Sequence, residues 1–172
     1  MSKPQRTLLL LAALFFAPFL LALALRFGGW QPGSTRNYGE LLSPPLPMHD
    51  VRASRDDGGA WTWVNTEHQW TLLVRVPQSC DDECARQLDI IPNVRVSLGR
   101  HAGRLHVFRL DGTTGEALPR LQLSGSLPAP LLTPPPSAVE AFLVDPHGFL
   151  VLRYAPGFDP SGLRRDLSRL IR

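Results

Sequence analysis

The stretch that decides the fold is WTLLVRVPQSCDDEC, residues 70–84. Its first seven residues are an apolar run in which Arg75 is the only charge, a pattern that favours a buried central β-strand. Pro77 ends the run, and Ser79 is a good N-cap for a helix that begins at Cys80. Three carboxylates would then lie in the first helical turn, where the positive end of the helix dipole favours them. The segment predicts a strand that leads into a helix, with two cysteines at the junction.

The residues that follow continue an α/β pattern. Pro92 is expected to break or kink the helix, with Gly99 as a later terminator. Residues 105–110 alternate like a second strand. Residues 141–144 and 149–154 bracket the sequence Asp-Pro-His-Gly and predict a β-hairpin around that turn.

Two further elements complete the pattern. Residues 51–53 and 61–64 flank a turn rich in glycine and aspartate, which predicts another hairpin. Asp159 and Pro160 supply the N-cap and first residue of an amphipathic terminal helix. Residues 112–136 show no clear period, and any helix there would be short. A strand–helix–strand crossover, an antiparallel pair and a covering helix predict an α/β, thioredoxin-like sandwich.

The amino-terminal end is apolar and uncharged over residues 7–25, with Pro18 as the one interruption. A helix of about 20 apolar residues crosses a hydrocarbon core of roughly 30 Å, and transmembrane helices often tolerate a proline. A cleaved signal peptide is the alternative, since residues 22–24 resemble a cleavage site. The run exceeds the usual apolar region of about 7–15 residues in such peptides, so we favour an uncleaved single transmembrane helix.

The charges around this run predict its orientation. Lys3 and Arg6 lie on its amino-terminal side against Arg26 alone on the other, which places the amino terminus in the cytoplasm. The rest of the chain then lies outside the cytoplasm, which in a Gram-negative bacterium means an inner-membrane anchor and a periplasmic body. The expected parts are a cytoplasmic stub with the transmembrane anchor over residues 1–29, a proline-rich connector over 30–48 and a periplasmic thioredoxin-like domain over 49–172.

The charge balance excludes several classes of partner and reaction. The chain of 172 residues has a formal net charge of +3, but three of its 18 basic residues flank the apolar run. The remaining 15 basic residues match the 15 acidic ones, so the body has no basic excess to attract nucleic acid. The sequence also has no G-x-x-x-x-G-K-[ST] loop, H-E-x-x-H helix or G-x-S-x-G elbow. Nucleotide and hydrolase chemistry therefore have no support.

Cys80 and Cys84 are the only two cysteines. On one helix their Cβ atoms would be about 5–6 Å apart, too far for a relaxed disulfide, whereas a bridge is feasible if Cys80 lies in the preceding turn. The pair can be a redox dithiol, a two-thiolate site for Cu(I), a static disulfide staple or two unpaired thiols. A bridge over three intervening residues adds little entropic stability, which favours chemistry over a staple.

These motifs resemble the signatures of the SCO/SenC family of cytochrome oxidase assembly proteins. The strand and C-x-x-x-C pair are similar to that family's copper-binding motif, and AFLVDPHGFLV, residues 141–151, is similar to its second signature. The resemblance runs in order over residues 40–171. It implies a thioredoxin-like fold, Cu(I) as cargo of Cys80 and Cys84, and a cytochrome c oxidase subunit or other assembly factors as partners.

Two positions depart from the family pattern. Ala85 follows the second cysteine where the family usually has proline. The family's third copper ligand, a histidine, falls at or beside Ser137, and serine is a poor Cu(I) ligand. The other candidate donors are expected elsewhere: His147 in a solvated turn, His101 and His106 at the surface, and Met48 and His49 in the connector, from which they could fold back. The resemblance thus implies Cu(I) held by two thiolates, or no metal.

We therefore expect a membrane-anchored periplasmic assembly factor for cytochrome c oxidase. Its dithiol would act in copper delivery or in thiol reduction at the oxidase copper site, with Cys80 as the attacking thiolate and Cys84 as the resolving one. The alternative is a non-catalytic periplasmic interaction module with a structural disulfide, and a general thiol–disulfide oxidoreductase is a third class. Whether the protein is an enzyme stays open, with the negative answer favoured; thiol–disulfide exchange is the activity that the cysteines would provide.

Overall fold

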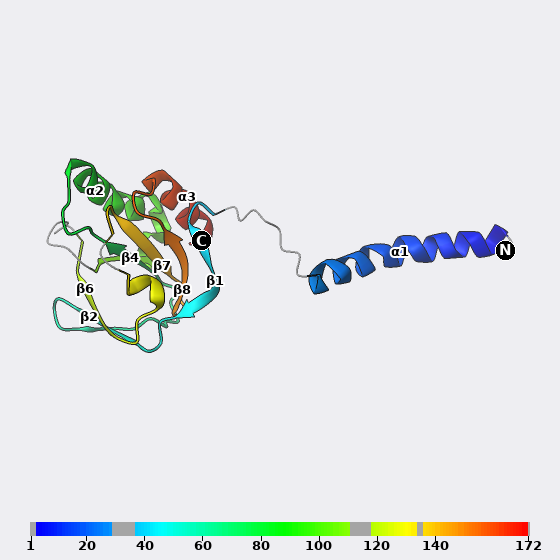
Figure 1. Cartoon of the computed structure of the whole chain (residues 1–172), viewed down its shortest axis with the longest axis horizontal. Helices are drawn as coiled ribbons and strands as arrows, with labels where there is room; N and C mark the ends of the chain where they lie inside the picture. Colours follow the sequence, from blue (N-terminus) through cyan, green and yellow to red (C-terminus); the bar gives the residue numbers. More distant parts are fainter. Residues whose placement is uncertain (1–2, 29–36, 111–117, 134–135, 172) are drawn as a thin grey trace. The chain divides into compact units, whose positions relative to one another are not determined.

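The computed structural model describes residues 3–28, 37–110, 118–133 and 136–171 (Figure 1). The chain divides into two compact units, Met1–Arg36 and Asn37–Arg172. The first unit holds α1 (Lys3–Phe27), a 25-residue helix that continues through Pro18. Its span Pro4–Phe27 is long and apolar enough to cross a membrane, and none of it is buried. The helix is therefore a candidate transmembrane span, as its length and composition predicted.

The second unit is a layered α/β sandwich. Its strands and helices are β1 (Glu40–Pro47), β2 (Val51–Arg55), β3 (Ala60–Trp61), β4 (Trp70–Arg75), α2 (Asp82–Ser97), β5 (Leu105–Arg109), β6 (Leu121–Gly125), β7 (Glu140–Val144), β8 (Phe149–Tyr154) and α3 (Pro160–Leu170), with the 3-10 turns η1 (Gly99–Arg104) and η2 (Ala129–Leu131). Among the described residues, one sheet has the order β1-β8-β7-β4-β5 and a smaller one has the order β3-β2-β6. In the large sheet only β4 and β5 are parallel, as the strand–helix–strand crossover requires.

The predicted central strand lies at the centre of this fold. β4 pairs with β7 on one side and β5 on the other, and every residue after Trp70 is buried. Leu72 and Val74 face the core that α2 and α3 cover, whereas Leu73 faces the core shared with the small sheet. The apolar run without polar alternation correctly predicted a buried central strand, because both faces of β4 are covered.

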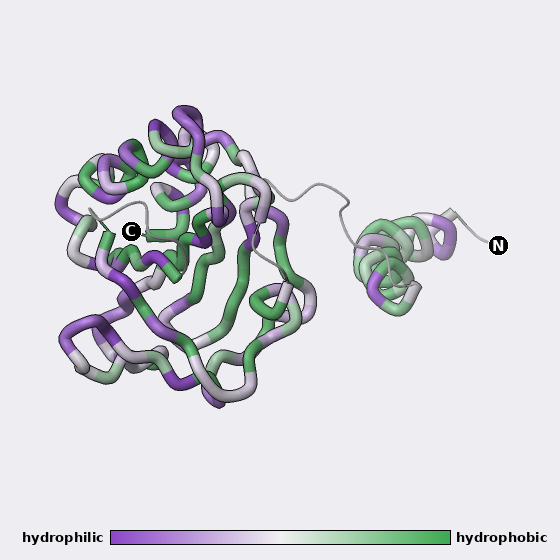
Figure 2. The backbone as a smooth tube through the Cα atoms, turned by 60° about the vertical axis from the view of Figure 1, so that its left-hand side comes forward, coloured by the Kyte–Doolittle hydropathy of each residue, from purple (hydrophilic) through white to green (hydrophobic). Residues whose placement is uncertain are grey.

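Two hydrophobic cores lie on opposite faces of the large sheet. The helix-side core joins α2 and α3 to the sheet, and the two helices lie side by side in Figure 1. The other core joins the large sheet to β2 and β6. Figure 2 shows hydrophobic residues along the strands between these layers and hydrophilic ones on the outer helix surface. The predicted hairpins β2–β3 and β7–β8 and the helix capped by Asp159 are all confirmed.

The expected connector is wrong over residues 40–47, which form β1 at the edge of the large sheet. β1 pairs with β8 from Glu40↔Arg153 to Pro47↔Phe149, and the register shifts between Leu41 and Leu46. The prolines in this segment argued against a strand. An edge strand tolerates them, because the backbone N–H groups on its outer side have no neighbouring strand to pair with. Connector residues 30–36 lie outside the described residues.

Two details of α2 also differ from expectation. Its N-cap is Asp81 instead of Ser79, so the helix begins at Asp82. Pro92 does not end it, because buried Leu88, Ile91 and Val94 hold the helix against the core on both sides of the proline. The helix ends at Ser97 with Leu98 as its C-cap, just before Gly99, whose φ of +57° matches the predicted terminator.

Besides β1, a second strand was not predicted. β6 lies in the stretch without a clear period and pairs with β2, from Val51↔Gly125 to Arg55↔Leu121. Only one of its residues, Leu121, is fully buried, so its five residues do not show the apolar alternation that predicts a strand. Residues 111–117, in the same stretch, lie outside the described residues.

Candidate functional site

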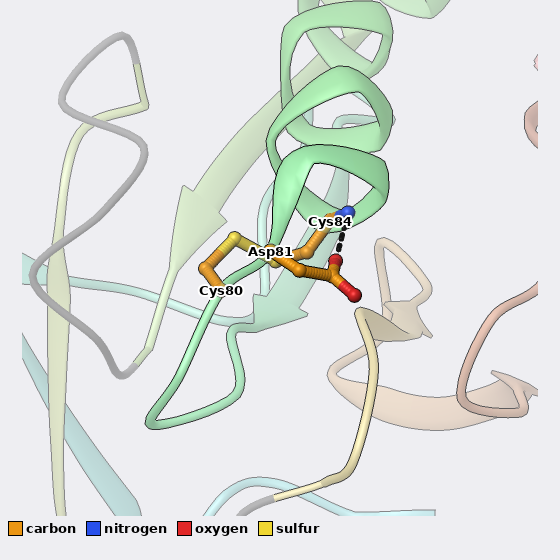
Figure 3. Close-up of a disulfide and its surroundings, with 3 residues drawn as sticks. All are labelled: Cys80, Asp81 and Cys84. Carbon is orange, nitrogen blue, oxygen red and sulfur yellow. Dashed lines mark hydrogen bonds between the residues drawn. A yellow bond between two sulfur atoms is a disulfide. The ribbon is translucent and has the colours of Figure 1, made fainter.

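Cys80 and Cys84 lie where β4 leads into α2, and they form a disulfide with their Cα atoms 5.2 Å apart (Figure 3). Cys80 precedes the helix and Cys84 lies in its first turn. This is the arrangement that makes a bridge over three intervening residues feasible. Neither cysteine is free, so of the four readings of the pair, two unpaired thiols is wrong for this structure.

Asp81 organises the start of the helix between the two cysteines. Its side chain accepts a hydrogen bond of 2.9 Å from the backbone N–H of Cys84, and its carbonyl accepts one of 2.9 Å from Ala85. In Figure 3 the carboxylate lies on the side of the helix start away from the sulfur–sulfur bond. Asp82 and Glu83 follow in the first turn, near the positive end of the helix dipole. The disulfide thus joins the residue before the capped helix start to the first turn of α2.

The disulfide borders an open groove with a volume of about 740 Å³. The groove lies between the start of α2, the loop that leads into α3, and two short segments beside them. Its lining residues are Tyr38, Ser79, Cys80, Asp81, Glu83, Cys84, Gln87, Ile90, Ser137, Ala138, Gly157, Phe158, Asp159 and Pro160. Cys84 is only 5% exposed, whereas Cys80 is partly exposed, so a reagent in the groove reaches Cys80 more easily.

Ser137 lines the same groove as the cysteines, although it lies far from them in the sequence. The position where the resemblance implies a histidine ligand therefore belongs to the cysteine site, but it carries a hydroxyl. No histidine is among the described residues that line the groove, and the described part of the chain holds no group of three metal-ligating side chains. The donor set that fits a soft ion here is the two thiols of the reduced protein.

The other candidate donors lie elsewhere. His147 is exposed in the β7–β8 turn, as expected, and its carbonyl oxygen lies 2.9 Å from Nε2 of His49. Met48, expected in the connector with the possibility of folding back, directly follows β1 and is fully buried in the core between the two sheets, not near the cysteines. His101 lies in η1 and is partly exposed.

The expectation that His106 is a surface residue was also wrong. It is half-buried on β5, with its ring 4.9 Å from that of Trp61 and 6.4 Å from that of Phe108. It was expected at the surface because it flanks the second strand, but Trp61 of the small sheet packs against that face of β5. Burial, helped by the positive charge of Arg95, lowers the pKa of His106.

Tyr38 is a groove residue that sequence reasoning missed. The backbone N–H groups of Tyr38 and Gly39 donate to the buried carboxylate of Asp166 at 2.8 and 2.9 Å. The Tyr38 hydroxyl accepts a hydrogen bond of 3.2 Å from the N–H of Asp159. Burial and Asp166 also raise the pKa of Tyr154, whose hydroxyl lies 3.4 Å from that carboxylate. The segment before β1 is therefore tied to α3 at the rim of the groove, a contact between residues 128 positions apart.

One polar contact joins two walls of the groove. The side chain of Gln87 on α2 donates a hydrogen bond of 2.6 Å to the carbonyl of Phe158.

A buried polar network lies at the end of β4. Arg75 pairs with Glu140 at 3.2 Å and donates to the hydroxyl and carbonyl of Thr133 at 2.7 and 2.8 Å. Glu140 also pairs with Arg153 at 2.7 Å. The single charge in the apolar run is thus the centre of a buried ion-pair network.

A layered α/β fold with a disulfide at the strand–helix junction defines a thioredoxin-like protein. A family model described as "Transmembrane-like, thioredoxin-like, C-terminal domain" matches residues 70–172, and the chain belongs to this family. The predicted thioredoxin-like fold is therefore confirmed. No curated protein matches the chain.

Three similar solved structures are Sco proteins, the family that the two sequence motifs resemble. Sco1 from Thermus thermophilus is 20% identical, with a TM-score of 0.48, over 81% of this chain and 98% of its own. ScoI from Arabidopsis thaliana, described with copper bound, is 17% identical, with a TM-score of 0.46, over 78% and 98%. ScoI from Bradyrhizobium japonicum, also described with copper bound, is 17% identical, with a TM-score of 0.43, over 77% and 98%.

Proposed function

We propose that this protein is a membrane-anchored assembly factor for cytochrome c oxidase that acts through Cys80 and Cys84 at the oxidase copper site. The observation that carries the proposal is the disulfide beside an open groove, with Cys80 within reach of a partner. The two sequence motifs and the thioredoxin-like family support it. A staple that served only stability would need no groove beside it.

Thiol reduction is the first form of this function. In the reduced protein, the Cys80 thiolate attacks a disulfide between the partner's copper-site cysteines, and one partner cysteine leaves as a thiolate. Cys84 then attacks the sulfur of Cys80 in the mixed disulfide and releases the second partner thiolate. The partner ends as a dithiol that can accept copper, and this protein ends with the disulfide that the structure contains. A dithiol reductant outside the cytoplasm must reduce it again.

Copper delivery is the second form, with Cu(I) as the cargo. The thiolates of Cys80 and Cys84 would supply the donors, since soft sulfur ligands select Cu(I). Ser137 lines the groove where a histidine donor would lie and contributes little. A site with two protein donors leaves Cu(I) open to attack by the partner's own thiolates, which suits transfer better than storage.

The proposed location follows from α1 and its flanking charges. We place the protein in the inner membrane as a single-pass protein with a cytoplasmic amino terminus and the Asn37–Arg172 unit in the periplasm. A disulfide in that unit is consistent with an oxidising compartment. The proposed partners are a cytochrome c oxidase subunit and other assembly factors.

Anaerobic Cu(I) titration of the reduced full-length chain in detergent tests which form applies. Copper delivery predicts one Cu(I) per chain, lost in the Cys80→Ser, Cys84→Ser variant and kept in a Ser137→Ala control. Thiol reduction predicts that the reduced chain opens the disulfide of an oxidised copper-site peptide, whether or not it binds Cu(I). The same double serine variant is then tested in cells: normal oxidase assembly would contradict the proposal and support a non-catalytic module with a structural disulfide.

A further inference from the structure

The groove beside the disulfide has an apolar rim. Among the described residues of the Asn37–Arg172 unit, few large apolar side chains are exposed, and two of them, Tyr38 at 51% and Ile90 at 46%, line this groove. Pro160, the partly exposed first residue of α3, adds apolar surface, and the buried ring of Phe158 lies behind it in the lining. Exposed apolar side chains gathered around a reactive group indicate a surface that another molecule covers.

The same groove is negatively charged. Asp81, Glu83 and Asp159 line it and are all exposed, and none of the described lining residues is Lys, Arg or His. Hydrogen bonds from Ser161 lower the pKa of Asp159, so that carboxylate stays ionised at neutral pH. Two arginines act on these carboxylates: Arg86 pairs with Glu83 on the exposed helix surface at 2.5 Å, and the charge of Arg165 contributes to the lowered pKa of Asp159. An exposed pair of this kind is weak and exchanges partners easily.

This charge acts on any thiol that approaches Cys80. The attacking species is a thiolate, an anion, and three carboxylates beside the target repel it. A cationic side chain next to the attacking cysteine offsets this repulsion, and an anionic one adds to it. The apolar rim in turn favours a cysteine in a polypeptide with apolar neighbours over a small hydrophilic thiol.

We propose that the groove selects, among thiol partners, a polypeptide segment whose cysteine is flanked by lysine or arginine and by apolar residues. This inference rests on the proposed thiol chemistry of the site. In the step concerned, the partner thiolate attacks Sγ of Cys80, a new sulfur–sulfur bond joins the partner to Cys80, and the Cys80–Cys84 bond breaks. Cys84 leaves as a thiolate and takes a proton from water, so no further oxidant or reductant is needed.

The test measures mixed-disulfide formation on the oxidised full-length chain in an uncharged detergent. The probes are two single-cysteine peptides of equal length, Arg-Leu-Cys-Leu-Arg and Glu-Leu-Cys-Leu-Glu, and each rate is divided by that peptide's rate with a small neutral disulfide. We expect a normalised ratio of about tenfold or more in favour of the basic peptide at low salt. The ratio should fall towards one near 1 M salt, where the Debye length is about 3 Å.

A matched pair of variants locates the effect. Glu83→Gln should lower the ratio severalfold, whereas Glu67→Gln, the same change on a carboxylate that does not line the groove, should leave it unchanged. Equal normalised rates for the two peptides, or a faster acidic peptide, would overturn the selectivity and leave the thiol chemistry standing. A disulfide that neither peptide opens, and that dithiothreitol opens only after unfolding, would overturn both.

Discussion

The side chain of Asp81 accepts a hydrogen bond of 2.9 Å from the backbone N–H of Cys84, so the residue that caps α2 also positions the second cysteine. The hydrogen bond does not involve either sulfur atom. We therefore expect it to persist when the disulfide is reduced, and in the proposed thiol reduction it would keep the Cys84 backbone in place for the attack on Cys80. The cap and the reactive pair are one local structure, built from five consecutive residues.

Replacing Asp81 by alanine tests the cap. Loss of the acceptor should lower the free energy of unfolding by about 1 kcal/mol in both the oxidised and the reduced protein. Asp81→Ser keeps a capping oxygen and should lose much less. Urea denaturation measures all three proteins, and equal stability of the alanine and serine variants would show that the cap contributes nothing.

The buried network around Glu140 predicts a larger effect. Glu140 is 1% and Arg75 3% exposed, so Glu140→Leu removes the buried carboxylate that pairs with the Arg75 guanidinium at 3.2 Å. Breaking one side of a buried pair typically costs about 3–5 kcal/mol. Glu83→Gln removes a surface pair with Arg86 instead, and should cost less than about 1 kcal/mol. Comparable losses in the two variants would refute this assignment.

The contact between Tyr38 and Gly162 predicts a reversal of the usual helix preference. Alanine in place of a helical glycine normally stabilises by up to about 1 kcal/mol. A Cβ atom on Gly162 would overlap the ring of Tyr38, so Gly162→Ala should destabilise the protein. Adding Tyr38→Ala removes the overlap.

A double-mutant cycle measured by thermal unfolding checks this contact. The alanine at position 162 should destabilise the protein with Tyr38 present and stabilise it with Tyr38 removed, a coupling of at least about 0.5 kcal/mol. Additive effects of the two substitutions would mean that Tyr38 does not pack on α3.

His106 predicts how stability depends on pH. Burial, and then the charge of Arg95, lower the pKa of His106 below 6.5, so the folded state binds fewer protons than the unfolded state. The contribution of His106 to stability is therefore complete above pH 6.5 and is lost as the pH falls through its folded pKa. The fall in Tm between pH 7.5 and pH 5 should be smaller in His106→Phe. An unchanged pH dependence would show that His106 is not the residue responsible.

Short-range sequence patterns predicted the part of the site that is built from residues close together in the chain. The apolar run of β4, the carboxylates of the first helical turn and the two cysteines follow each other within 15 residues, so neighbouring side chains decide their structure. The β7–β8 turn and the cap of α3 were predictable for the same reason. Local patterns could not decide between Ser79 and Asp81 as the N-cap of α2, because both side chains suit that position.

The sequence by itself determined a buried strand leading into a helix with a dithiol at the junction, because a few adjacent residues set those preferences. Only the tertiary structure decided that residues 40–47 are an edge strand, that Met48 is core and that Tyr38 is tied to Asp166. It also decided which residues surround the disulfide, since the groove brings together four segments that are far apart in the chain. The physical reason is that packing and hydrogen bonds between distant segments depend on the whole fold. The local periodicity of apolar residues carries no information about which distant segments meet.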